Sequence, residues 1–97
     1  GAITQIFTPS PVANGKMYRE QFTLPAGDTT VTVPQAIDAL FNEGMTIVLD
    51  GYDYPVIITT GTPIADEVKF TTATGAIQFP YADADNDRNG YIQYQII

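Results

Sequence analysis

The stretch from Met45 to Phe79 constrains the fold most, because it carries short runs of β-forming residues separated by turn signals. Residues 46–49 and 56–60 are rich in β-branched side chains. They flank Asp50 and Gly51, a dipeptide that favours the positive φ angles of a tight hairpin turn. We therefore expect a β-hairpin whose two strands are these two runs.

A second hairpin is expected directly after the first. Residues 67–71 and 76–79 alternate apolar with polar side chains, and Gly75 between them suits a left-handed position in the connecting loop. In the segment 17–24 the same alternation predicts that Phe22 and Leu24 point into the core. Further strands are expected at residues 29–33 and 91–97.

The period of the pattern changes only after the segment 29–33. Pro34 suits the first position of a helix, and Ala36, Ile37, Leu40 and Phe41 follow at helical spacing. We expect one short helical segment near 34–42 that plugs the open end of a sandwich.

The whole pattern indicates an all-β fold. About seven or eight short strands at intervals of roughly ten residues predict an antiparallel β-sandwich or small barrel, either immunoglobulin-like or jelly-roll-like. Residues 17–97 are expected to form a single β-sandwich domain. Residues 1–16, with two prolines, are expected to form an N-terminal arm or edge strand with a linker.

Composition argues against several classes of function. The 97 residues carry a formal charge of −7, which opposes binding to nucleic acid or to an anionic membrane surface. Cysteine and histidine are absent, so a Ser-His-Asp triad and a thiolate metal site are excluded. The acidic side chains fall mostly in expected turns, where solvent keeps their pKa values ordinary. We therefore expect no enzymatic activity.

The acidic loop from residue 83 is a candidate metal site. Asp83, Asp85 and Asp87 stand at every second position and are followed by Asn89. This resembles the start of a calcium loop, in which alternating oxygen ligands converge on a hard cation. The sixth position, usually glycine, is Arg88 here. The alternative is a solvated acidic turn, since Asp and Asn are common where they hydrogen-bond their own backbone; no cofactor is then needed.

Tyrosines near the acidic residues offer a candidate glycan-binding surface. Tyr52, Tyr54, Tyr81 and Tyr91 supply flat rings beside carboxylates. The alternative is that they are half-buried covers of a sheet with the hydroxyl at water. If these tyrosines bind glycans, the chain is a carbohydrate-binding or immunoglobulin-like adhesion module of a larger surface protein.

The order of segments is similar to that of a known class of small β-modules. The segments are 22–25, 30–34, a short Ala-Leu segment, 48–52, 58–63, 68–70, 74–79 and 91–94. In this order the chain resembles, over residues 20–97, small β-sandwich modules of tailed-phage virion proteins, such as head-decoration, head-fibre and accessory tail proteins. The resemblance implies a structural protein of the virion, assembled in the host cytoplasm, that acts by surface contact and has no active site.

Apolar residues near both ends suggest self-association. Ile3, Ile6 and Phe7 lie in the expected arm, and Ile96 and Ile97 close the last expected strand. These residues need a cover, and a second copy of the chain would supply one. We expect a homo-oligomer, most plausibly a trimer, with the arm docking on a neighbouring copy or on other virion proteins.

Overall fold

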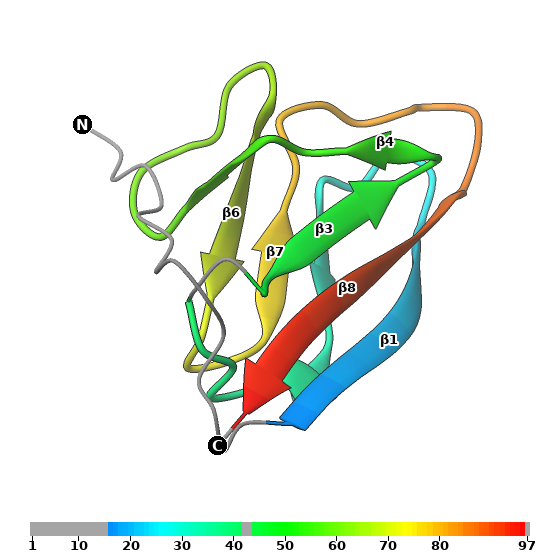
Figure 1. The fold of residues 1–97 in the computed structure, drawn as a ribbon. Helices are drawn as coiled ribbons and strands as arrows, with labels where there is room; N and C mark the ends of the chain where they lie inside the picture. The colour runs from blue at the N-terminus through cyan, green and yellow to red at the C-terminus, as the bar shows by residue number, and fades with distance from the viewer. Residues whose placement is uncertain (1–15, 42–43, 97) are drawn as a thin grey trace.

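A computed structural model describes residues 16–41 and 44–96 of the chain. These residues form two four-stranded sheets that pack against each other (Figure 1), with strand orders β1-β8-β3-β4 and β2-β7-β6-β5. The expected all-β sandwich is thus confirmed. The elements are β1 (Lys16–Leu24), β2 (Thr30–Thr32), the 3₁₀ helix η1 (Pro34–Ala36), β3 (Thr46–Leu49), β4 (Tyr52–Asp53), β5 (Val56–Ile58), β6 (Glu67–Thr71), β7 (Ala76–Gln78) and β8 (Arg88–Ile96).

Apolar side chains from both sheets meet in one core. Alternation along each strand sends every second side chain inward, and Phe22 and Leu24 of β1 are buried as expected. Tyr94 of β8 is also buried, and its hydroxyl donates a hydrogen bond to the Gln35 carbonyl oxygen at 3.0 Å. The other buried members include Ile47, Leu49, Ile57, Val68, Phe70, Ile77, Phe79 and Ile92.

The first hairpin turn forms where the sequence predicts it. Asp50 and Gly51 have φ angles of 52° and 80°, the two positive values of a type I′ turn. The turn joins β3 to β4 in antiparallel register, with Leu49 opposite Tyr52.

The prediction that residues 56–60 form the second strand of this hairpin is wrong. Residues 56–58 leave the sheet and form β5 in the opposite sheet, where they pair with β6. The Tyr54 N–H still donates to the Ile47 carbonyl oxygen at 3.0 Å. The hairpin ends after this bond because Pro55 has no N–H to continue the ladder. The β5–β6 pair is parallel, so one of the two sheets is mixed and the expected antiparallel sandwich needs this correction.

The second hairpin is confirmed. Strands β6 and β7 pair antiparallel, with Lys69 opposite Gln78 and Thr71 opposite Ala76.

The expected helical segment is shorter than predicted. Pro34 does occupy the start of a helix, but η1 is a 3₁₀ helix that ends at Ala36. Asp38 has a φ of 66°, and its N–H donates to the Thr72 carbonyl oxygen at 3.0 Å, while the Leu40 N–H donates to Gln95 at 2.8 Å. Backbone groups that a longer helix would use internally are instead bonded to neighbouring strands and turns.

Strands β1 and β8 form the longest ladder in the described residues. They pair antiparallel over nine residues, from Lys16 opposite Ile96 to Leu24 opposite Arg88. Strand β8 lies between β1 and β3, so β1 is an edge strand, as Figure 1 shows. The expected arm lies outside the described residues up to position 15.

Candidate functional site

Two of the four predicted glycan-contact tyrosines lie together near the β3–β4 hairpin. The rings of Tyr52 and Tyr54 meet edge to face with centroids 4.9 Å apart, and Tyr54 also packs against Phe79. The Tyr52 hydroxyl donates a short hydrogen bond to the Asp66 carboxylate. This bond raises the pKa of Tyr52, and burial raises the pKa of Tyr54.

Of the other two tyrosines, Tyr81 lies near this pair, since after burial it also contributes to the raised pKa of Tyr54, whereas Tyr91 belongs to different surroundings. Tyr81 is 62% exposed, and its carbonyl oxygen accepts a hydrogen bond from Arg88 at 2.8 Å. Tyr91 lies on the outer face of β8, where the Arg19 guanidinium stands 4.4 Å from its ring centroid. The structure therefore does not gather the four rings on one surface.

Two of the three predicted aspartate ligands in the acidic loop, Asp83 and Asp87, accept hydrogen bonds from backbone N–H groups. One Asp83 carboxylate oxygen accepts from the N–H groups of Asp85 and Asn86, at 3.0 and 3.2 Å, and these bonds lower the pKa of Asp83. Asp87 accepts from the Ala26 N–H at 2.9 Å. The loop thus has the hydrogen bonds of an Asx turn.

No group of three or more acidic, His or Cys side chains that could hold a metal occurs within residues 16–41 and 44–96. Asn89, the fourth candidate ligand, accepts a hydrogen bond from the Thr23 hydroxyl at 2.8 Å. It lies on the outer face of the β1–β8 pair, where it lines a hollow in the protein surface.

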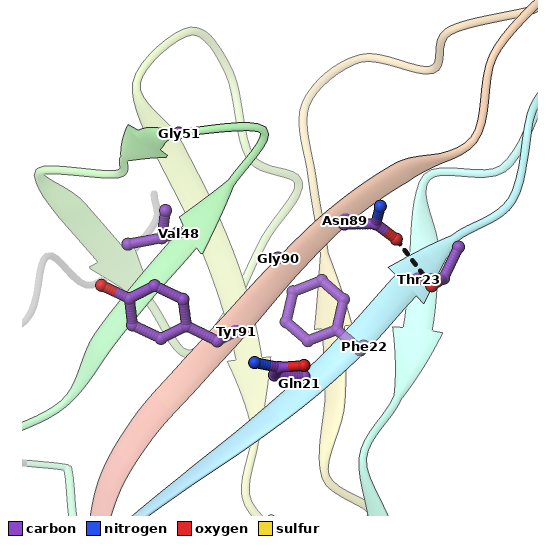
Figure 2. A pocket seen from close by; sticks show the side chains of 8 residues that line it. All are labelled: Gln21, Phe22, Thr23, Val48, Gly51, Asn89, Gly90 and Tyr91. Atoms are coloured by element: carbon purple, nitrogen blue, oxygen red, sulfur yellow. Dashed lines mark hydrogen bonds between the residues drawn. The ribbon is translucent and has the colours of Figure 1, made fainter.

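We call this hollow the outer-face depression. It measures about 720 Å³ and is open to solvent on the outer side of the sheet that contains β1, β8 and β3. Figure 2 shows the residues that line it: Gln21, Phe22, Thr23, Val48, Gly51, Asn89, Gly90 and Tyr91. Only Tyr91 was predicted to contact a glycan, and Asn89 was predicted as a metal ligand.

The sequence contains a signal for this surface that the four-tyrosine interpretation missed. Gln21 and Thr23 alternate with the buried Phe22 and Leu24, and Asn89 and Tyr91 alternate with inward positions of β8 in the same way. Alternation alone therefore places them on the outer face. The register that sets Gln21 opposite Tyr91 and Thr23 opposite Asn89 cannot be read from it.

A second hollow is mainly apolar. It measures about 480 Å³, lies between the segment after η1 and the β6–β7 hairpin, and is lined by residues that include Leu40, Phe41, Phe70 and Ala73. We call it the apolar groove.

Only one of the five residues predicted to form oligomer contacts lies in the part of the chain that the structure describes. Ile96 is partly buried and packs against the core at the end of β8, an interior strand. Ile3, Ile6, Phe7 and Ile97 lie outside the described residues.

Comparison with known proteins yields no relative. No family model, no curated protein and no solved structure matches the chain. None of the helices in the described part of the chain is long and apolar enough to span a membrane.

Proposed function

We propose that this chain is a structural protein of a tailed-phage virion, a head-decoration, head-fibre or accessory tail module that works by protein–protein contact. The resemblance of residues 20–97 to such modules is the starting point. In this role the chain self-associates as a trimer and needs no cofactor.

The free edge of β1 is the observation that carries this proposal. Nine residues of β1 pair with β8 on one side, and no other strand of the described residues pairs with the opposite side. An edge strand presents unpaired N–H and C=O groups that can pair with a strand of another chain. The first half of β1 is also exposed, with Met17 at 46% and Tyr18 at 41%.

The sequence that precedes this edge contains apolar residues. Ile3, Ile6 and Phe7 lie within the fifteen residues before β1. Strand addition at the edge would give the backbone pairing, and these side chains would be covered by a neighbouring copy or by another virion protein. Contact of this kind needs no catalytic group.

Light scattering coupled to size exclusion tests self-association. The unmodified chain should run as a trimer, and Met17→Asp should lower the mass, because aspartate is disfavoured in strands and adds to the net charge of −7. Ile64→Asp is the matched control, since Ile64 is also apolar and is 67% exposed in the loop before β6. A monomer at every concentration, or equal masses for the two variants, would count against the β1 contact.

The virion assignment has a separate test. Phage particles purified from a culture that produces the chain should contain it, in a fixed ratio to the major capsid or tail protein, when they are measured by quantitative mass spectrometry. Recovery of the chain only in the particle-free fraction would refute the assignment.

A further inference from the structure

We propose that the outer-face depression binds a neutral saccharide. This inference is independent of the proposed virion role, because it concerns the outer face of the sheet and not the free edge of β1. It also differs from the four-tyrosine surface predicted from the sequence, because only Tyr91 of those four tyrosines lines the depression.

The size and shape of the depression suit a small polar ligand. Its volume of about 720 Å³ falls within the range of roughly 300–1,000 Å³ that is usual for ligand sites. It is open to solvent, so an elongated ligand could lie across the strands and extend beyond both ends.

Uncharged hydrogen-bonding groups surround the depression. Asn89 accepts from the Thr23 hydroxyl at 2.8 Å, a bond drawn in Figure 2 that fixes the orientation of the amide. The Asn89 amide nitrogen and the Gln21 amide make no side-chain hydrogen bond within residues 16–41 and 44–96, and neither does the Tyr91 hydroxyl. Amides and a phenol both donate and accept, which matches the hydroxyl groups of a sugar.

The Tyr91 ring gives the depression a rigid apolar wall. The Arg19 guanidinium lies 4.4 Å from the ring centroid and donates a hydrogen bond to the Gln93 amide oxygen at 3.0 Å, which ties Arg19 to β8. Arg19 does not line the depression, so the part of Tyr91 that does remains open to a ligand. Tyr91 and Val48 together offer apolar surface for the C–H face of a sugar ring, and a ring already held in place loses little entropy on binding.

Charge selects a neutral ligand over an anionic one. Among the residues that the structure describes, those that line the depression carry no charged side chain, while the chain as a whole carries −7. A sulfated or carboxylated saccharide would approach against this potential without a cation in the lining to compensate it.

A nuclear magnetic resonance titration of the full chain tests the site. The probes are neutral hexasaccharides of α-1,4-glucose, β-1,4-glucose, β-1,3-glucose, mannose and N-acetylglucosamine, with a heparin hexasaccharide as the anionic arm. At least one neutral probe should shift the amide signals of Gln21, Asn89, Gly90 and Tyr91. Tyr91→Ala should weaken that binding at least tenfold, whereas Tyr81→Ala, which removes an exposed ring elsewhere, should leave the dissociation constant unchanged.

A milder variant keeps the proposal testable if Tyr91→Ala does not fold. Gln21→Ala removes an exposed amide from the depression and should weaken binding several-fold without loss of the native spectrum. The proposal is overturned if no neutral probe shifts these signals, if the shifts map to Tyr52 and Tyr81, or if the heparin probe binds more tightly than every neutral one. None of these results would bear on the oligomer mass or on the presence of the chain in virions.

Discussion

Replacing Gly75 with alanine should destabilise the fold far more than the same change at Gly51. Both glycines have positive φ angles, 75° and 80°, so an added Cβ costs about 1–2 kcal/mol of backbone strain at either position. At Gly51 nothing lies within 4 Å of the new atom. At Gly75 the new atom would overlap the carbonyl oxygen of Val33 and lie 2.9 Å from its carbonyl carbon.

The neighbour at Gly75 cannot move aside at low cost. Val33 is buried, its N–H donates to the Gly75 carbonyl oxygen at 2.9 Å, and its own carbonyl oxygen accepts from the Ala36 N–H at 2.9 Å. Overpacking of this kind costs about 1–3 kcal/mol. The total for Gly75→Ala is therefore about 2–5 kcal/mol, a large part of the roughly 5–15 kcal/mol that stabilises a typical domain.

Urea and thermal unfolding followed by circular dichroism would measure the difference. Each kcal/mol lost should lower the melting temperature by about 4–8 °C for a chain of this size. Gly51→Ala is the matched control for strain without overlap. Equal losses of stability in the two variants would refute the argument that the contact between Gly75 and Val33 limits this position.

Three further changes test single hydrogen bonds. Tyr94→Phe leaves the Gln35 carbonyl oxygen without its 3.0 Å donor and should lower the free energy of unfolding by about 0.5–1.5 kcal/mol in urea titrations; an unchanged value would mean that water replaces the hydroxyl. Because backbone N–H groups hold the pKa of Asp83 below 3.8, its carboxylate stabilises the fold above that pH, and the contribution disappears as the pH falls through the lowered value. The stability gap between the unmodified chain and Asp83→Asn should therefore shrink in acid, and a gap independent of pH would contradict the assignment. The bond to Asp66 raises the pKa of Tyr52 above 10.0, so its contribution is complete below that pH and disappears as the pH rises through the raised value. Tyr52→Phe should remove one late step from an absorbance titration of the phenols, and loss of an early step instead would show that Tyr52 titrates normally.

Local turn chemistry made much of the fold predictable. Asp50 and Gly51 specify a two-residue turn through their own φ preferences, and Gly75 does the same in the next hairpin, so both turns follow from a few adjacent residues. The pairing of residues 56–58 could not be predicted in this way. They pair in parallel with β6, about ten residues later in the chain, and the turn residues Gly61 and Pro63 between them do not specify a parallel partner. Pro55 was the available hint that the first hairpin stops early.

The length of the helical segment near 34–42 was predicted wrongly for a related reason. The spacing of Ala36, Ile37, Leu40 and Phe41 reports which side chains are apolar, but not which backbone groups compete for the same hydrogen bonds. In the fold, Thr72 and Gln95 accept the N–H groups of Asp38 and Leu40, and neither contact has a counterpart in local sequence.

The candidate site was predictable only in its parts. The alternation in β1 and β8 places Gln21 and Tyr91 on an outer face, but their meeting depends on a register between strands about seventy residues apart. The bond between Tyr52 and Asp66 is likewise set by how β4 and the loop before β6 lie in space. Grouping tyrosines by their closeness in sequence therefore joined Tyr91 to rings with different surroundings.

The antiparallel ladder between β1 and β8 also decides how the protein responds to mechanical force. Lys16 and Ile96 face each other at one end of that ladder, so a pull applied between them loads only the terminal pair at any moment. The hydrogen bonds would then break one after another at low force, rather than resisting together in shear. If the chain is attached to a larger particle through Lys16 alone, β8 lies outside the path of the load, and the sandwich stays closed while the linkage is under tension.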